Sequence, residues 1–579
     1  MTRRLADEIT AEHIDAPPGE ARQYRKGVFV PVDTDAMADA PDSAAYPARG
    51  SGPPFKIKDD VPRVPGLRNI LGPSIIALAM GLGAGELLLW PNLITVNGYS
   101  IWWLLWLGVV TQFVVISEIE RWTIATGESV FAGMARLGPG AVWPWFFLLA
   151  TMVSFFWPGW ASASSDFIAQ IAEEVGGVRI AWQPIALIML LLIWLGLALS
   201  PIVYNSLERL EMSLAIGFFP LLAITLLIVG IAPGDFPDLL RGAVSVGSAP
   251  PALLTGEQFP TLLIAVGYAG SGGTLLLAQS LWLRDKGFGM GAFQGRIAGI
   301  RGENEPILDT GLVFSAETPL SVARFRAWMR VASKELLLTF VCLILISVVM
   351  TTLLVTATLG TGNAELAGDL TGMIERQAAV LHEIGGSPLK ITFLLAGALV
   401  LFSTQVGIVD TVTRIAGTIF HERYGFRSEH WNLRRTFLVF LTIFVLASAA
   451  IIVVSWLDRT SVNQLRPNFL VLIAGPFVIA SMYAFTLVVG TINTRRLPLA
   501  LRPSAWRRAG LVWAATLWGW FTAEQISRVL LDLANSPEAA DSIEFHPVRA
   551  AVYAAWLGSL LWFGWTLLGP GARRPQHGV

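Results

Sequence analysis

Apolar runs long enough to cross a bilayer recur along most of the chain, and short polar connections separate them. A membrane-spanning helix takes about 20 mainly apolar residues. With that length as the measure, the sequence predicts spans at 67–97, 101–125, 141–170, 182–202, 207–232, 257–283, 330–359, 388–419, 433–456, 467–493, 507–532 and 547–568. We therefore expect an all-α polytopic protein with about twelve transmembrane helices in a lipid bilayer.

The polar segments outside these runs predict the orientation. Lys and Arg gather in the loops after even-numbered spans, whereas the loops after odd-numbered spans are poor in both. The positive-inside rule then places both termini and the loop 284–330 in the cytoplasm. Residues 1–65 lack an apolar run and are expected to be a disordered cytoplasmic tail, and 569–579 a short cytoplasmic tail. We expect a bacterial inner (plasma) membrane protein.

The first apolar run is interrupted at its centre. Residues 71–91 read LGPSIIALAMGLGAGELLLWP, which places three glycines and Glu86 where the hydrocarbon is thickest. Glycine weakens a helix, and a carboxylate at this depth is costly unless it faces protein or water. The pattern indicates either a discontinuous helix around a transport site or a continuous helix whose small residues allow close packing.

A second interrupted run favours the discontinuous helix. Residues 257–282 read EQFPTLLIAVGYAGSGGTLLLAQSLW, with the glycine-rich segment 267–274 at the centre. Interrupted spans at corresponding positions of two halves are the best sequence indication of a transporter site.

The span count predicts an internal repeat. The segments 67–232 and 257–493 each hold five spans. Because five is odd, the second set must cross the membrane upside down relative to the first, as in LeuT-type transporters. We expect a LeuT-like core at 66–500, with two additional transmembrane helices at 501–568.

Composition excludes several classes of function. Of 579 residues, 54% are hydrophobic and 14% charged, and the formal net charge is −1, so no nucleic-acid partner is expected. No histidine lies inside an apolar run, and the single Cys342 cannot form an internal disulfide. The sequence contains no phosphate-binding loop motif, so it gives no indication of ATP-driven pumping. A membrane enzyme would need a mid-membrane cluster of His, Cys or paired acids, and the sequence shows none. We therefore expect no catalytic residues and no cofactor.

The substrate-binding candidates are the residues of the two interruptions. They are Gly81, Gly83, Ala84, Gly85, Glu86, Tyr268, Ala269, Gly270, Ser271, Gly272, Gly273 and Thr274. Unwound backbone at the glycines would offer carbonyls to a cation or N–H groups to an anion. Tyr268, Ser271 and Thr274 add the polar side chains of the second interruption.

The ion-coupling candidates are polar residues within apolar spans. They are Glu86, Asp166, Ser403, Thr404, Gln405 and Asp410. Glu86 has three candidate roles: a ligand for a cation, a proton acceptor, or a structural carboxylate that caps the second half-helix. Asp166 either relays protons or lies at the exofacial interface. The hydroxyls near 403 suit Na⁺, whereas Asp410 with Arg414 can be a plain ion pair. The coupling ion is therefore a proton or sodium.

Four motifs resemble a known family. They are GPS at 72–74, GAGE at 83–86, RWTIATG at 121–127 and NTRRL at 493–497. In position they resemble Gly-Pro-Gly, Asp-Pro-Gly-Asn, Arg-Leu-Gly-Val-Val-Thr-Gly and the closing Arg-Arg-Leu stretch of the natural resistance-associated macrophage protein (NRAMP) family. That family comprises proton-coupled transporters of divalent transition metals with the LeuT fold. The resemblance covers about 67–500.

The departures from that family concern the metal ligands. Its metal-binding Asp and Asn correspond to Gly83 and Glu86, and its methionine to Gly272. No glutamine lies in the tenth span to match the one that family uses. Because a thioether helps select transition metals, its loss implies an altered substrate. We expect a divergent NRAMP-related secondary-active transporter of a hard divalent cation such as Mg²⁺ or of a small organic solute. The alternative is a non-transporting membrane sensor or binding protein on the same fold.

Overall fold

In a computed structural model of the chain, the structure describes residues 42, 53–58, 61–65, 71–139, 141–250, 253, 258–302, 305, 307–425, 430–457, 470, 475–534 and 545–573.

Helices make up nearly all of the regular structure. The first half contains α3 (Pro73–Ala84), the π-helical turn η2 (Gly85–Leu89), α4 (Trp90–Asn97), η3 (Tyr99–Ile101), α5 (Trp102–Thr126), α6 (Val130–Ala135), α7 (Val142–Phe155), α8 (Gly159–Gly176), α9 (Trp182–Ala198), α10 (Val203–Val229) and α11 (Asp235–Val244). The second half contains α13 (Phe259–Gly267), η4 (Gly273–Ala278), α14 (Gln279–Lys286), η5 (Gly289–Phe293), α15 (Pro319–Glu335), the π-helical η6 (Leu336–Cys342), α16 (Leu343–Leu359), η7 (Ala364–Leu366), α17 (Leu370–Tyr424), α18 (Leu433–Leu457), α20 (Gly475–Arg495), η9 (Leu499–Leu501), α21 (Ala505–Leu533), α23 (Pro547–Leu568) and η10 (Pro570–Arg573). The short strands β1 (Lys56–Ile57) and β2 (Leu312–Val313) pair in parallel.

The described helices have the lengths and surfaces of membrane spans. Nine helical stretches within the described residues are long and apolar enough to cross a bilayer, and α9 is a shorter apolar helix. Large apolar side chains such as Leu149, Leu227 and Leu561 are exposed on the outer faces of α7, α10 and α23. Such a surface suits lipid and not water. The all-α polytopic architecture is confirmed, while the count of twelve spans stays a prediction.

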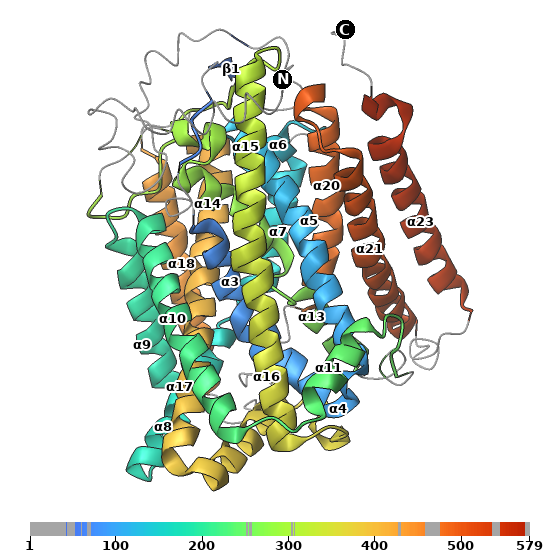
Figure 1. Cartoon of the computed structure of the whole chain (residues 1–579). Helices are drawn as coiled ribbons and strands as arrows, with labels where there is room; N and C mark the ends of the chain where they lie inside the picture. Colours follow the sequence, from blue (N-terminus) through green and yellow to red (C-terminus); the bar gives the residue numbers. More distant parts are fainter. Residues whose placement is uncertain are drawn as a thin grey trace.

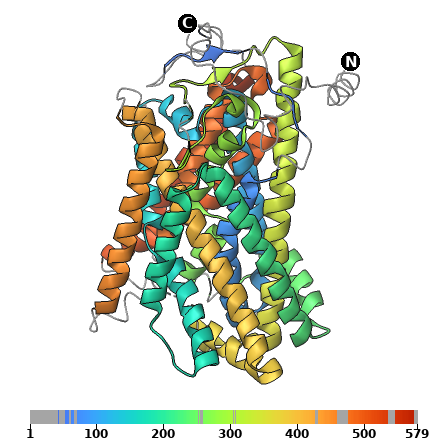
Figure 2. The same ribbon diagram turned by 90° about the vertical axis from the view of Figure 1, so that its left-hand side faces the viewer.

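The two halves run in opposite directions. Figure 1 shows α3 nearer the end of the bundle that carries β1 and α4 at the opposite end, whereas the chain passes from α13 toward α14 in the reverse sense. We call the end with β1 the β1 end. The last turns of α23 also lie there (Figure 1), and the turned view in Figure 2 shows α15 projecting at the same end.

Several predicted boundaries were wrong. The loop predicted at 284–330 is shorter, because α14 runs to Lys286 and α15 begins at Pro319. With η6 and α16, α15 forms one helical stretch of 41 residues. Its first part is amphipathic and buries Phe325 and Trp328, so its many basic residues conceal a helix in the sequence.

The prediction of a disordered tail over residues 1–65 was also wrong for the last part of that segment. Residues 53–58 and 61–65 pack against the helical bundle, with Phe55 and Val61 buried. The amide of Lys56 donates to the carbonyl of Gly311, and that of Lys58 to the carbonyl of Val313. The remainder of the predicted tail lies outside the described residues apart from Asp42.

Candidate functional site

The first span is not unwound at its glycines, contrary to the prediction of a discontinuous helix. Helix α3, the η2 turn and α4 follow one another without a gap from Pro73 to Asn97, and Ala84 and Glu86 lie within this helical stretch. The glycines instead allow close approach of neighbouring backbone. A Cβ at Gly83 would lie 2.2 Å from the Thr404 hydroxyl oxygen, and one at Gly85 would lie 2.1 Å from the Tyr268 carbonyl oxygen.

The sixth predicted span, 257–283, is interrupted as predicted. Helix α13 ends at Gly267 and helical structure resumes only at Gly273. Gly270 has φ +105° and Gly272 has φ +63°, conformations that a side chain disfavours. Gly81 faces this segment, since a Cβ there would lie 2.9 Å from the Gly270 carbonyl carbon. The segment 268–272, which we call the interruption, therefore crosses the glycine-rich face of α3.

Gln112 of α5 supports the carbonyls that the interruption leaves without helical partners. Its side-chain amide donates to the carbonyls of Gly267 (3.2 Å) and Ala269 (2.6 Å). Sequence analysis did not identify this residue, although an amide inside the apolar run of α5 is itself a signal.

Glu86 links the continuous first span to the interruption. Its Oε1 accepts a hydrogen bond from the Gly270 amide at 3.0 Å, and its backbone carbonyl accepts one from the Thr351 hydroxyl at 2.7 Å. The side chain is fully buried, and Oε2 makes no hydrogen bond within the described part of the chain. One carboxylate oxygen thus holds the interruption, and the other is available to a proton, a cation or a solute.

Three aromatic rings surround the start of the interruption. Tyr268 lies edge-on to Trp160 and Phe155, with ring centroids 6.0 and 6.2 Å away. Phe155 ends α7 and Trp160 is the second residue of α8, so the third predicted span is also broken, at 156–158. The sequence Trp157-Pro158-Gly159 inside an apolar run was the signal for this break.

Buried donors without partners gather around these rings. Among the residues that the structure describes, the Tyr268 hydroxyl, the Trp160 indole N–H, the Ser154 hydroxyl and the Gln405 amide nitrogen make no hydrogen bond. Gln405 is held beside them because its Oε1 accepts from the Ala161 amide at 3.0 Å. We call these four residues with Phe155 the aromatic cluster. A buried donor without a partner costs free energy that a ligand oxygen can recover.

Among the other predicted binding residues, Ser271 of the interruption and Thr274 of η4 have hydrogen-bond partners. Ser271 donates to the Ala77 carbonyl of α3, and the Thr151 hydroxyl donates to that of Thr274 at 2.8 Å. A Cβ at Gly273 would lie 3.1 Å from the Phe155 ring. These contacts join the interruption to α3 and α7.

The predicted ion-coupling residues of α17 do not form one site. Ser403 donates to Glu211 of α10, a buried carboxylate that sequence analysis did not identify. The Thr404 hydroxyl donates to the Ala79 carbonyl of α3 at 3.1 Å. Asp410 forms a two-point ion pair with Arg414, which also contacts Asp285 of α14. Asp410 therefore matches the ion-pair alternative.

Asp166, in the middle of α8, has polar partners that lie toward and beyond the C-terminal end of that helix. It accepts from the Gln170 side chain at 3.0 Å and lies 3.4 Å from the half-exposed Arg179. Arg179 also contacts Glu375. Asp166 is thus placed in an ion-pair cluster that reaches the surface, and none of these contacts involves Glu86.

A polar network ties down the β1 end of α3. Glu335 of α15 accepts hydrogen bonds from the amides of Gly72 (3.2 Å) and Ser74 (3.1 Å), which places a carboxylate at the α3 N-terminus. The Gln279 amide donates to Glu120 at 2.9 Å and to the Ser74 hydroxyl at 3.2 Å. The start of α3 is thereby fixed to α5, α14 and α15.

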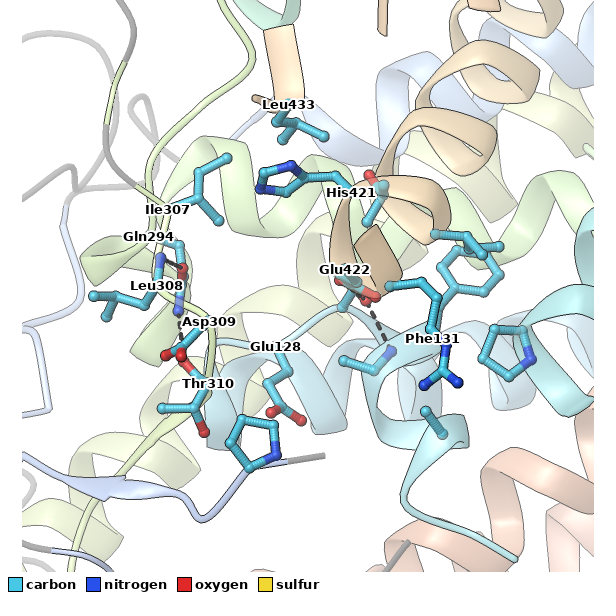
Figure 3. Close-up of a pocket in the computed structure, with 18 of the residues that line it drawn as sticks. Glu128, Phe131, Gln294, Ile307, Leu308, Asp309, Thr310, His421, Glu422 and Leu433 are labelled. Atoms are coloured by element: carbon cyan, nitrogen blue, oxygen red, sulfur yellow. Dashed lines mark hydrogen bonds between the residues drawn. The ribbon is translucent and has the colours of Figure 1, made fainter. Parts of the chain in front are cut away.

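A separate small pocket of about 100 Å³ lies at the β1 end, between α6, α17 and residues 307–310. Figure 3 shows Gln294 and Thr310 on one side of it and Glu422 with His421 on another. Two of its carboxylates, Glu128 and Glu422, are already partnered, by Arg136 and Ser129, and a third, Asp309, is exposed. No predicted site residue lines it, so it is not the site that the sequence indicated.

Comparison with solved structures identifies the fold. The Eremococcus coleocola manganese transporter in complex with an aromatic bis-isothiourea substituted compound matches with a TM-score of 0.58 and 12% identity, over 88% of this chain and 97% of that chain. A mutant of the same transporter matches with a TM-score of 0.56 and 12% identity, over 88% and 98% of the two chains. Neither protein-family models nor curated protein sequences match the chain. The predicted LeuT-type fold is confirmed, and the NRAMP resemblance rests on the sequence motifs alone.

Proposed function

We propose that the chain is a secondary-active transporter of a small organic solute, coupled to a proton or sodium gradient. The observation that carries the proposal is the interruption at 268–272, which is held by a hydrogen bond from the Gly270 amide to the buried Glu86. The fold around it is similar to that of a manganese transporter. In this proposal residues 66–500 form the transporting core, and α21 and α23 are additions to it.

The aromatic cluster supports an organic substrate. Its four unpartnered donors suit carbonyl or carboxylate oxygens, and its three rings suit an apolar or planar body. The ligand set of a transition-metal site is not evident, because no group of three His, Cys, Asp or Glu residues occurs within the described ranges. Gly83 and Gly272 also stand where the NRAMP family has its Asp and Met.

A hard divalent cation is the second candidate substrate. The position of Glu86 favours such a cation, since its buried Oε2 has no hydrogen-bond partner within the described residues while its Oε1 accepts from the Gly270 amide of the interruption. Oxygen ligands of this kind suit Mg²⁺.

Transport by the purified chain in proteoliposomes tests these proposals. Labelled neutral amino acids and nucleobases serve as organic probes, and entrapped dyes report Mg²⁺ and Mn²⁺ entry. We expect gradient-driven uptake of an organic probe, and Tyr268→Phe should lower its kcat/KM about tenfold because a donor to the solute is lost. Tyr483→Phe is the matched control, since that hydroxyl contacts Ser559 between α20 and α23.

Three results would contradict the organic-solute proposal. Saturable Mn²⁺ uptake competed by Fe²⁺ or Cd²⁺ but not by Mg²⁺ would establish a transition-metal transporter. Saturable Mg²⁺ uptake without organic uptake would favour the second candidate. Solute binding without any uptake would favour the sensor.

A further inference from the structure

A wide basic groove lies at the β1 end, between α15 and the segment that runs from η9 into α21. Its volume is about 1360 Å³. Its cationic lining residues are Arg121, Arg326, Arg330, Lys334, Arg502, Arg507 and Arg508. Glu317 is the one acidic residue among the described residues that line it. We call this surface the basic groove.

Its outer wall is a row of exposed cations on one face of α15. Arg326, Arg330 and Lys334 are spaced four residues apart, so they project from the same side of the helix. All three are exposed. The row is therefore open to a partner from outside the protein.

The groove lies where the surface changes from polar to apolar. Directly after Lys334 the helix exposes Leu337 (43%) and Leu338 (54%). Trp506, at the start of α21 and next in sequence to the groove residue Arg507, is 88% exposed. Exposed leucines beyond a basic row, with a tryptophan beside it, are the pattern of a membrane–water interface. The cations then stand at the level of lipid headgroups.

The inner wall joins three helices and concentrates positive charge. Arg507 of α21 contacts Glu118 of α5 (3.1 Å) and Ser333 of α15 (2.9 Å). Burial, with the nearby charge of Arg508, lowers the pKa of Arg502. Arg121 and Arg507 share Glu118 as their carboxylate partner. The groove therefore keeps a marked excess of positive charge.

We propose that the basic groove binds the headgroup of an anionic phospholipid from the membrane leaflet at this end. The phosphate lies against Arg326, Arg330 and Lys334, and the acyl chains follow the exposed leucines below them. The continuity of the cationic wall with the apolar surface favours a lipid over a soluble anion, which would leave that surface unused. A bound headgroup would also bridge α15 and α21.

Native mass spectrometry of the full chain in detergent, titrated with phosphatidylglycerol or phosphatidylcholine, tests this proposal. We expect tighter binding of phosphatidylglycerol. Replacement of Arg326, Arg330 and Lys334 together by Ala should weaken that binding at least about tenfold, since each cation near an anionic headgroup contributes to affinity. Arg330→Ala alone should give a smaller loss in the same direction.

The matched control is the triple replacement of Arg301, Arg423 and Arg435 by Ala. It removes the same charge from exposed positions at the β1 end outside the groove. Unchanged lipid binding in the control supports the proposal. Equal losses in the two triple variants, or no loss in either, would overturn it. So would glycerol 3-phosphate binding as tightly as the lipid, because the occupant would then be a soluble anion.

Discussion

At Gly83 the backbone of α3 comes so close to α17 that no side chain fits between them. An added Cβ would lie 2.2 Å from the Thr404 hydroxyl oxygen, so the neighbour must move. We expect Gly83→Ala to destabilise the protein by about 1–3 kcal/mol, the usual cost of overpacking. Thermal unfolding in detergent measures it. Gly196→Ala on α9 is the control, because no atom lies within 4 Å of its added Cβ. A stable Gly83→Ala variant would show that this contact adapts freely.

Two substitutions of Glu86 distinguish the role of its hydrogen bond to the Gly270 amide from the role of its charge. Glu86→Gln keeps an oxygen to accept the Gly270 N–H but removes the charge, whereas Glu86→Ala leaves that buried N–H without a partner. We expect only Glu86→Ala to lose stability, by about 1–3 kcal/mol. With an organic substrate, Glu86→Gln should still exchange labelled solute in counterflow while losing uphill accumulation. Unchanged uptake, affinity and pH profile would leave Glu86 with a structural role alone.

Single residues were predictable from the sequence only where their chemistry is costly in a membrane. Glu86 stands out in an apolar run, and the structure places it against the interruption. The aromatic cluster did not stand out, because Phe155 and Trp160 are ordinary residues of an apolar span until the break at 156–158 brings them beside Tyr268. Gln112 and Glu211 make hydrogen bonds to residues far away in the sequence, Ala269 and Ser403. A single sequence does not show which distant residues pair in this way.

At the scale of elements, glycine content alone did not distinguish a break from close packing. Gly81, Gly83 and Gly85 occur in a helical stretch, while the interruption at 268–272, inside the glycine-rich segment 267–274, is not helical. The difference is visible in the backbone: Gly270, Gly272 and Gly273 all have positive φ, and the α3 glycines do not. Apolar periodicity located the spans, but the basic start of α15 was hidden by its charged residues.

The segment at 53–58 is an element that the sequence did not predict, and it should behave as a locally stable unit. Phe55 is 2% exposed, lies 3.8 Å from the Arg136 guanidinium and packs against Trp122. We expect Phe55→Ala to speed hydrogen exchange at the amides of Lys56 and Lys58 by at least about 100-fold, since a large buried ring is lost.

Hydrogen exchange read by mass spectrometry measures this effect. Lys56→Ala is the control, because among the described residues the side chain of Lys56 makes only an ion pair with the exposed Asp42, and partly exposed pairs of this kind contribute little. Equal exchange rates in Phe55→Ala and the unaltered chain would show that the backbone pairing with Gly311 and Val313 holds the segment without the ring.

At the scale of the whole molecule, the all-α polytopic architecture is the property that the sequence predicted best. The alternation of basic and acidic loops predicted that both termini and the loop before α15 share one side. The structure places β1, the start of α15 and the end of α23 at one end (Figure 1). Which end faces the cytoplasm follows from the positive-inside rule alone.

Labelling of single cysteines in sealed vesicles checks the sidedness. Ile300 and Ala364 are exposed, and they belong to opposite ends, because the Ile300 amide contacts Ala198 at the end of α9 and the Asn363 amide contacts Thr95 of α4. In a Cys342→Ser background, we expect Ile300→Cys to react with an impermeant maleimide only from the cytoplasmic side and Ala364→Cys only from the other. Exposed positions are needed, since a residue such as Met290 is fully buried and would not label from either side. Detergent-opened vesicles, in which both variants should label fully, control for access. Reaction of both variants from the same side would contradict the prediction that the bundle crosses the membrane between these two loops. A reversed pattern would place the β1 end, with the basic groove, outside the cell.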